Sequence, residues 1–177
     1  QSTGASEPKV LAPFALRTSQ DFAHMRVSGT PHTWSNAQHA WANGLLNEWP
    51  VHKLHHALGY YTQEDIPFQF ALAEAFTICD AYHCSFHGGT NPNRVFLWAG
   101  TNAPLQHEPV LTNDYDNLDH DPEGGYTFLT YSERLEKAGV SWQVYQDMAD
   151  NFTDNPLAGF RSYRDAARGR AGALEAR

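Results

Sequence analysis

At 177 residues the chain is long enough to bury a core, and its 13% aromatic and 18% charged residues are typical of a globular protein rather than a disordered one. A net charge of −8, with 12 scattered lysines and arginines, argues against a nucleic-acid-binding protein. No run of about eighteen apolar residues is present, so no transmembrane helix is predicted. Residues 1–8 also lack the charged and apolar regions of a signal peptide.

The N-terminal part is predicted to form an extended arm followed by a helix. Residues 1–31 hold one apolar patch, interrupted by proline, which indicates an extended arm or edge segment. A helix is predicted over residues 35–48, capped by Thr33 or Ser35 and ended by Pro50. Its apolar residues recur at helical spacing: Trp34, Ala37, Trp41 and Leu45.

Three histidines follow in the segment VHKLHHALGYY. His52, His55 and His56 have a spacing at which side chains share one face of a helix, so a zinc site is one interpretation. However, the segment is short and no carboxylate flanks the group. We therefore favour a solvated surface turn.

The segment QEDIPFQFALAEAF predicts an amphipathic helix. Asp65 is expected to be its N-cap, and Pro67 suits the first turn, where the missing N–H has no intrahelical partner. A short buried strand is predicted directly afterwards, at residues 76–78. The succession of helix, strand, loop and helix favours an α/β fold with a parallel sheet, in which ligands bind beyond the carboxyl ends of the strands.

A polar loop after residue 78 leads into the second of these helices through Gly88, Gly89 and Thr90. Two glycines allow a sharp turn and the close approach of a ligand, and Pro92 again suits a first helical turn. Thr90 is therefore predicted to be the N-cap, beside free N–H groups and the positive end of the helix dipole. Such a position binds phosphate well. Capping alone and nucleophilic attack are both open to this threonine.

The same loop contains a rival nucleophile, Ser85, with His83 two residues away. It lacks the Gly-x-Ser-x-Gly elbow, and neighbours so close in sequence seldom face one another, so this interpretation is not favoured. Cys79 and Cys84 could form a bridge if the loop folds back, or could be two reduced, buried thiols. Their spacing does not indicate zinc.

The C-terminal half is predicted to begin with a long surface loop over residues 101–127. Its acidic residues suggest calcium, but EF-hand spacing is missing and a solvated loop is favoured. Thr130 and Glu133 form a capping box that opens a helix ending at Gly139. A strand is predicted from 140 to 145, and the tail from 164 to 177 is predicted to be a fraying helix.

Three blocks of this sequence resemble a known family. They are HTW at 32–34, GYYTQEDIPFQFALAEAFTICDAYHCSFHGGTNPNRVFLWAGT at 59–101 and TYSERLEKAGVSWQVYQDMADNFTDNPLAGF at 130–160. Together they look like the bacterial phosphoesterases of the alkaline phosphatase superfamily, and among these most like the phosphocholine-specific phospholipases C. The resemblance implies a three-layer α/β fold with a mostly parallel sheet, incomplete in this chain. Residues 32–165 would then be part of the catalytic domain, residues 1–31 an N-terminal arm and residues 166–177 a C-terminal helical tail.

The resemblance also implies roles for individual residues. The Thr-x-Pro-Asn segment makes Thr90 the nucleophile and a ligand of a divalent metal, and implies a phosphothreonine intermediate. His32, in the His-x-Trp element, would contact phosphate or protonate a leaving group. The amide of Asn113 would donate to a phosphoryl oxygen, because related proteins place an asparagine some twenty residues after the nucleophile; a capping or turn role is the alternative for this residue.

The implied reaction is release of phosphocholine from a phospholipid, either phosphatidylcholine or sphingomyelin, with transient contact to a membrane surface and no nucleic-acid partner. The implied location is secreted or periplasmic, in a bacterium. Two alternatives stay open: a broad-specificity acid phosphatase of the same family, and a non-catalytic lipid- or choline-binding protein.

The sequence departs from the resembled family in one respect. The Glu-Asn-x-Ser-Phe-Asp-His block, which supplies metal ligands in those enzymes, is not present in these 177 residues, and neither are the later paired aspartates and histidines. We therefore expect an internal piece of a longer protein, which needs the remaining segments of the full-length chain for catalysis.

Overall fold

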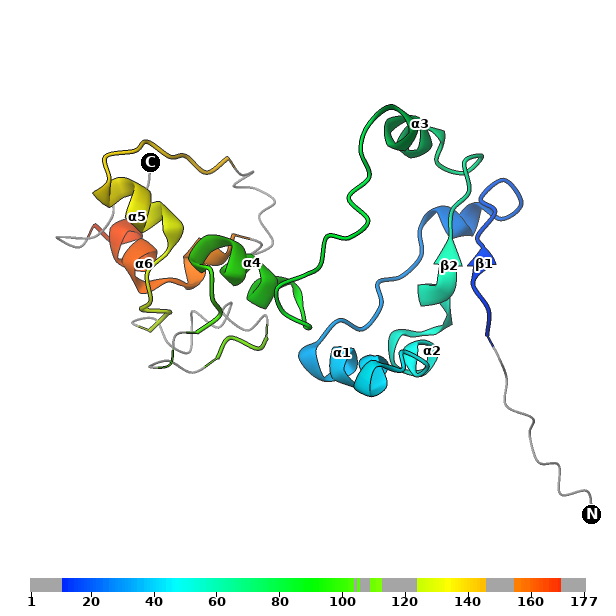
Figure 1. The fold of residues 1–177 in the computed structure, drawn as a ribbon, viewed down its shortest axis with the longest axis horizontal. Coiled ribbons are helices and arrows are strands. Elements are labelled where there is room, and N and C mark those ends of the chain that lie inside the picture. The colour runs from blue at the N-terminus through cyan, green and yellow to red at the C-terminus, as the bar shows by residue number, and fades with distance from the viewer. Residues whose placement is uncertain (1–10, 104, 106–108, 113–123, 146–154, 170–177) are drawn as a thin grey trace, which may run out of the picture. The chain divides into compact units, whose positions relative to one another are not determined.

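The computed structural model describes residues 11–103, 105, 109–112, 124–145 and 155–169 (Figure 1). The chain divides into two units, Gln1–His83 and Cys84–Arg177, and each is described by itself. The strands and α-helices, in chain order, are β1 Phe14–Ala15, α1 Trp34–Trp41, α2 Trp49–Lys53, β2 Gly59–Tyr60, α3 Pro67–Ala75, α4 Thr90–Ala99, α5 Tyr131–Lys137 and α6 Arg161–Ala167. Short 3-10 helices lie at Phe22–Met25, Ala42–Gly44, His55–Leu58 and Pro156–Gly159.

The first unit contains a small parallel sheet made of β1 and β2. Phe14 pairs with Gly59 and Ala15 pairs with Tyr60. The N–H of Leu16 then donates to the carbonyl of Tyr60 at 2.9 Å. Helices combined with a parallel strand pair agree with the predicted α/β class. β1 lies inside the segment that was predicted to be an extended arm.

Helix α1 is shorter than the sequence predicted. Thr33 is its N-cap, as expected, and accepts from the N–H of Asn36. The helix ends at Trp41 because Ala42 and Asn43 both adopt left-handed backbone conformations, with φ of 47° and 55°. The predicted continuation to residue 48 is therefore wrong.

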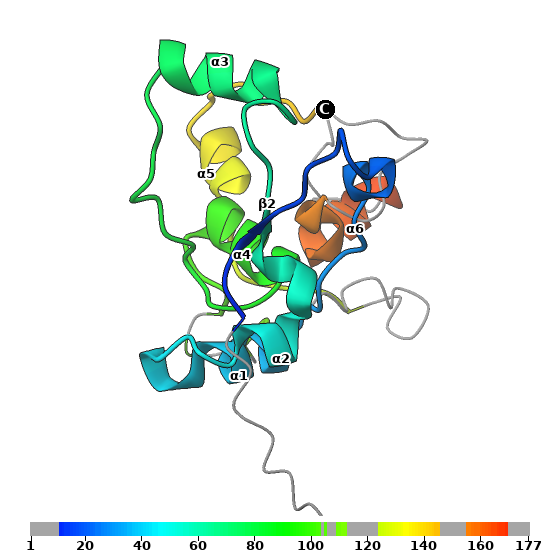
Figure 2. The same ribbon diagram turned by 90° about the vertical axis from the view of Figure 1, so that its right-hand side faces the viewer.

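The expected role of Pro50 as a helix terminator is also wrong, since it lies in the first turn of α2. Figures 1 and 2 show α1 and α2 side by side. The buried face of α1 is formed by Ala37 and Ala40, whereas Trp34 and Trp41 are exposed.

Helix α3 begins with Pro67 in its first turn, as predicted. Ile66, not Asp65, occupies the N-cap position, because the carboxylate of Asp65 is engaged elsewhere. No residue of α3 is buried, although the helix is mostly apolar. The strand predicted at 76–78 is wrong: these residues are exposed and no neighbouring strand pairs with them in the described part of the chain.

The second unit has its own hydrophobic core beneath α4 and α6. Phe160 is completely buried, and the rings of Tyr126 and Phe128 meet it edge-on, each with centroids 5.2 Å away. The other buried apolar residues are Val95, Val110, Leu157 and Tyr163. Val95 thereby anchors one face of α4 in this core, whereas Leu97 on the same helix is 75% exposed.

A parallel bridge joins Tyr126 to Phe160 across this core. The N–H of Tyr126 donates to the carbonyl of Gly159 at 2.8 Å, and the N–H of Arg161 donates to the carbonyl of Tyr126 at 2.9 Å. Gly125 precedes the bridge with φ of 113°, and a Cβ there would lie 2.8 Å from the carbonyl oxygen of Gly159. Glycine is therefore required at this close approach.

The predicted capping box opens α5. Thr130 accepts from the backbone of Glu133, and the Glu133 carboxylate accepts from the N–H of Thr130 at 2.7 Å. Both Thr130 and Ser132 are fully buried, and their hydroxyls bond the phenol of Tyr163 on α6. This polar cluster fixes the start of α5 against α6. The helix ends close to Gly139, as predicted.

Two further predictions concern the C-terminal region. The strand predicted from 140 to 145 is wrong, because no ladder forms there among the described residues. The predicted tail helix is present in part, as α6, and residues 170–177 lie outside the described residues, as does most of the acidic loop, at 113–123. Across the described ranges, no helix combines the length and apolar character needed to cross a bilayer.

Candidate nucleophile segment and its surroundings

Thr90 is the first residue of α4 and is exposed. The N-cap is Gly89, not Thr90 as predicted, because Gly89 keeps an extended conformation (φ −81°, ψ −171°) while Thr90 is already helical. Since glycine has no side chain to cap with, the first-turn N–H groups beside Thr90 lack a side-chain cap. The arrangement thus offers a hydroxyl and the positive end of a ten-residue helix on the same turn.

The loop before Thr90 is held by the side chain of Asn93. Its amide oxygen accepts from the N–H of Phe86 at 3.0 Å. Its amide nitrogen donates to the carbonyls of Phe86 and Gly89, both at 2.9 Å. The ring of Phe86 also stacks over that of Phe96, with centroids 6.5 Å apart. One side chain therefore folds the 86–89 loop onto the first turn of α4.

Asn91, the residue after Thr90, connects the same turn to a distant part of the chain. It is 2% exposed, and its amide nitrogen donates to the carbonyl of Thr112 and to the hydroxyl of Tyr126, both at 3.1 Å. Asn113 itself lies outside the described residues, so its predicted phosphate contact stays a prediction. The preceding residue, Thr112, nevertheless accepts a hydrogen bond from Asn91, which follows Thr90.

Sequence reasoning missed Asn91 and Asn93. Both lie in the first helical turn, where asparagine competes with the backbone for hydrogen bonds. Two asparagines flanking Pro92 were therefore a usable signal, but their partners are 4 to 35 residues away in sequence and could not be named.

His32 lies just before α1 in the first unit and is exposed, with its Nδ1 2.8 Å from the carbonyl oxygen of Thr30. The neighbouring carbonyl of Pro31 accepts from the Nζ of Lys53 at 2.7 Å. Lys53 is 7% exposed, and burial lowers the pKa of this amine. Its ammonium also lies over the ring of Trp49. His32 and Thr90 belong to different units, and its predicted phosphate contact stays a prediction.

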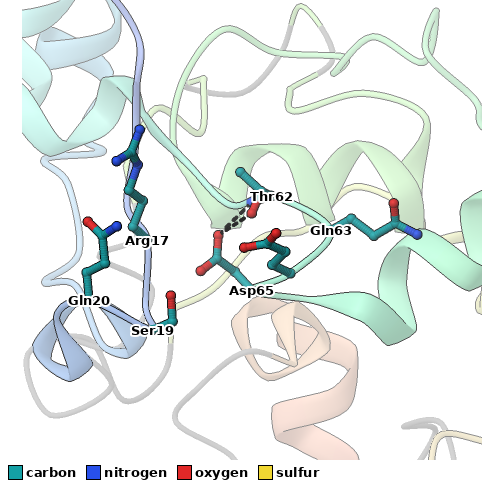
Figure 3. Close-up of a pocket in the computed structure, with 7 residues that line it drawn as sticks. Arg17, Ser19, Gln20, Thr62, Gln63 and Asp65 are labelled. Atoms are coloured by element: carbon teal, nitrogen blue, oxygen red, sulfur yellow. Dashed lines mark hydrogen bonds between the residues drawn. The ribbon is translucent and has the colours of Figure 1, made fainter.

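A pocket of about 480 Å³ lies at the carboxyl ends of β1 and β2 (Figure 3). Three of its residues follow β1 and four follow β2: Arg17, Ser19, Gln20, Thr62, Gln63, Glu64 and Asp65. Ligands of open parallel sheets bind at this edge, but ligand pockets are mostly apolar, and this one is lined by polar and charged residues. The pocket belongs to the first unit and Thr90 to the second.

Asp65 joins the two loops that form this pocket. Its carboxylate accepts from the N–H and hydroxyl of Thr62, at 2.8 and 2.7 Å, and from those of Thr18, at 2.7 and 2.8 Å. These hydrogen bonds, those from Thr62 first, hold the pKa of Asp65 well below its usual range. The carboxylate therefore stays ionised and ties the ends of β1 and β2 together.

Other candidates from the sequence are not brought together. Ser85 and His83 are exposed, and they fall in different units. Cys79 and Cys84 are free and exposed, so the expectation of buried thiols is wrong and the bridge does not form. The rings of His39 and His52 lie 4.9 Å apart, a pairing that was not predicted.

A metal centre is not assembled by the described residues. No three His, Cys, Asp or Glu side chains among them are grouped so as to hold an ion, and the zinc interpretation of His52, His55 and His56 finds no support there. A threonine oxygen alone is a poor cation site. The divalent metal that the resemblance implies therefore needs donors beyond those brought together here.

Comparison with known proteins identifies the family to which the chain belongs. The sequence matches the phosphoesterase family over residues 1–176, which is nearly the whole chain. The chain belongs to the phosphoesterase family. The exposed Thr90, the buried Pro92 and the half-buried Asn93 are thus part of a phosphoesterase sequence.

Several relatives carry the name phospholipase C. Over 89% of its length the chain is 61% identical to a non-hemolytic phospholipase C of Pseudomonas aeruginosa, covering 23% of that protein. It is 39% identical to a non-hemolytic phospholipase C of Burkholderia pseudomallei, over 92% of the chain and 25% of that protein. It is 34% identical to phospholipase C A of Mycobacterium tuberculosis, over 93% of the chain and 34% of that protein. The chain thus spans between 23% and 34% of the length of these curated relatives.

Proposed function

We propose that this chain supplies the nucleophile segment of a phosphodiester hydrolase that releases phosphocholine from phosphatidylcholine or sphingomyelin. The observation that carries the proposal is the exposed Thr90 at the first turn of α4, in a chain of the phosphoesterase family. The names of the relatives support a phospholipid substrate. The proposed enzyme adopts the three-layer α/β fold of the superfamily, with residues 32–165 as part of its catalytic domain.

The proposed reaction proceeds in two displacements at phosphorus. The Thr90 oxygen forms a bond to phosphorus and gives its proton to a base, while the bond to the diacylglycerol or ceramide oxygen breaks and that oxygen gains a proton. Water then attacks the phosphothreonine from the opposite side, which restores the threonine hydroxyl and releases phosphocholine. A hydroxyl is too weak an acid to attack unaided, so activation of Thr90 is essential.

In this proposal, the N-terminus of α4, His32 and Asn113 stabilise the negative charge on the phosphoryl oxygens. Support for Asn113 comes from the bond between Asn91 and the carbonyl of Thr112, because it ties the preceding residue to the turn that carries Thr90. His32 is available for contact because it is exposed. No step is assigned to a metal, since the described residues do not assemble a donor set for one.

The substrate lies in membranes, so the proposed enzyme makes transient contact with a lipid surface. Its proposed location, secreted or in the periplasm of a bacterium, rests on the family resemblance alone. Neither a nucleic-acid partner nor a transmembrane anchor is part of the proposal. The proposal does include the remaining segments of a full-length chain, because the chain covers only 23% to 34% of the length of these relatives.

Replacing the Thr90 hydroxyl tests the proposal directly. In the full-length protein, Thr90→Val keeps the side-chain shape and removes the oxygen, so hydrolysis of p-nitrophenyl phosphorylcholine should fall by roughly 10³-fold or more. Thr90→Ser keeps a hydroxyl and should retain activity. Intact mass after brief exposure to substrate should show a phosphocholine-sized adduct on the wild-type protein and none on Thr90→Val.

The matched control is Thr101→Ala, which removes a threonine hydroxyl at the other end of α4 that accepts from the N–H of Ala103. It should hydrolyse the substrate like the wild type. Unchanged turnover by Thr90→Val would place the nucleophile elsewhere. Faster turnover of a simple phosphate monoester than of phosphatidylcholine by the wild type would favour an acid phosphatase instead.

A further inference from the structure

We infer that Asn93 is a positioning residue, whose carboxamide sets the place of the Thr90 hydroxyl by clamping the 86–89 loop to α4. This inference rests on the proposed function of Thr90. It assigns Asn93 no contact with substrate. The structural basis is a set of three hydrogen bonds from a single side chain, at 3.0, 2.9 and 2.9 Å.

The first two hydrogen bonds pair the carboxamide with the backbone N–H and C=O of one loop residue, Phe86. The amide oxygen of Asn93 accepts from the N–H of Phe86, and its amide nitrogen donates to the carbonyl of the same residue. Both polar groups of one backbone residue are thus satisfied by a side chain that offers a donor and an acceptor in fixed geometry. Among the uncharged side chains, only asparagine and glutamine offer this pair on a planar amide.

The third bond reaches the residue directly before Thr90. The nitrogen of Asn93 also donates to the carbonyl of Gly89, which is buried. Gly88 and Gly89 have no side chains to restrict them, so the loop has wide conformational freedom of its own. The clamp removes that freedom at the peptide that leads into Thr90. The N–H of Gly88 adds a bond to the carbonyl of Phe86 at 2.9 Å.

Position matters more for Thr90 than for an ordinary loop residue. Attack requires its oxygen to lie in line with the phosphorus at about 3 to 3.5 Å, and a misplacement of about 1 Å can cost about 100-fold in rate. Loss of the clamp should therefore lower the rate of phosphorylation of Thr90. Substrate binding should change little, because Asn93 is directed at the loop.

The experiment compares Asn93→Ala and Asn93→Asp in the full-length protein. Both lose the two donated bonds, and the aspartate also places a negative charge against two carbonyl oxygens. A carboxylate near a helix N-terminus favours the helix and offsets part of this loss, and circular dichroism of Asn93→Asp checks that the variant is folded. We expect each variant to lose about 10- to 100-fold in kcat, with KM within about threefold of the wild type. Rapid-quench mass spectrometry should show the Thr90 adduct forming more slowly by the same factor.

Asn102→Ala is the matched control. Asn102 lies just beyond the other end of α4, and the change removes a hydrogen bond from its side-chain amide to the carbonyl of Val110, at 3.1 Å. Its kcat should stay near that of the wild type. Wild-type kcat in Asn93→Ala would overturn the inference, and so would an equal loss in Asn102→Ala or a change confined to KM. Should Asn93→Ala fail to fold, Asn93→Asp alone decides. Persistent turnover by Thr90→Val would instead refute the proposed function and leave the clamp without a role.

Discussion

At the scale of single residues, Asp65 shows how one carboxylate can organise two loops. It accepts four hydrogen bonds from Thr18 and Thr62 and lowers its own pKa by doing so. Because the folded-state pKa lies below the unfolded value of about 3.9, this stabilisation is present above about pH 4 and is lost as the pH falls further. Asp65→Asn lacks this titration.

We therefore predict that lowering the pH from about 7 to 3 reduces the melting temperature of the wild-type chain more than that of Asp65→Asn, measured by circular dichroism. At pH 7 the variant should be the less stable of the two, because an amide presents one acceptor oxygen where the carboxylate presents two. Glu64→Gln, which alters the adjacent exposed residue, is the control and should follow the wild type. Identical pH dependence in Asp65→Asn would contradict the assignment.

Asp65 also marks the limit of sequence reasoning at this scale. It was predicted to cap α3, because it stands before Pro67 and an apolar run. Thr18, which outcompetes that role, is 47 residues away in sequence. Thr33 and the Thr130–Glu133 pair were predicted correctly because a cap and its partner are three residues apart. Thr62, which also binds the Asp65 carboxylate, is three residues away and was a local partner that the sequence analysis missed. Two of the local caps could thus be predicted, whereas the distant partner could not.

At the scale of elements, α5 depends on one buried cap. The hydroxyl of Thr130 serves its own helix and also meets the phenol of Tyr163 on α6 at 3.1 Å. Thr130→Ala removes the cap and leaves buried partners unsatisfied, so it should lower the free energy of unfolding by about 1 to 3 kcal/mol. Urea denaturation followed by tryptophan fluorescence measures the loss. Lys137→Ala, an exposed change in the same helix, should stay within about 0.5 kcal/mol of the wild type, and an equal loss in both would refute the cap's importance.

The two wrongly predicted strands have a common cause. Residues 76–78 and 140–145 have apolar or alternating patterns typical of strands, but a strand also needs a neighbour to bond, and none is present for either in the described part of the chain. In contrast, β1 and β2 pair with each other although their paired residues are 45 positions apart in sequence. Pattern indicates the capacity to form a strand, whereas pairing depends on what else is folded nearby.

At the scale of the whole molecule, much apolar surface is left uncovered in the described residues. Helix α3 is apolar and has no buried residue, with Phe68 at 68% and Phe76, just after it, at 72% exposure. Helices of this composition are normally buried. We expect polypeptide outside the described residues to cover α3, in line with the 23% to 34% of the relatives' length that the chain spans.

The 177-residue chain should accordingly be much less active than a full-length protein. It carries the proposed nucleophile, but its described residues do not assemble a metal site, and α3 lacks cover. We predict no measurable hydrolysis of p-nitrophenyl phosphorylcholine by the chain under conditions in which the full-length protein turns over. Circular dichroism is the control that the chain is folded in this assay, and equal rates for the two proteins would contradict the prediction.

The two cysteines lie on either side of the boundary between the units. Cys79 belongs to the first unit and Cys84 to the second, both are free and exposed, and the chain contains 2 cysteines in all. Thiol-reactive spin labels would therefore attach at one native position in each unit, without any mutagenesis. The spread of distances between the two labels would report how rigid the segment at residues 80–83, which ends at the boundary between the units, is in solution.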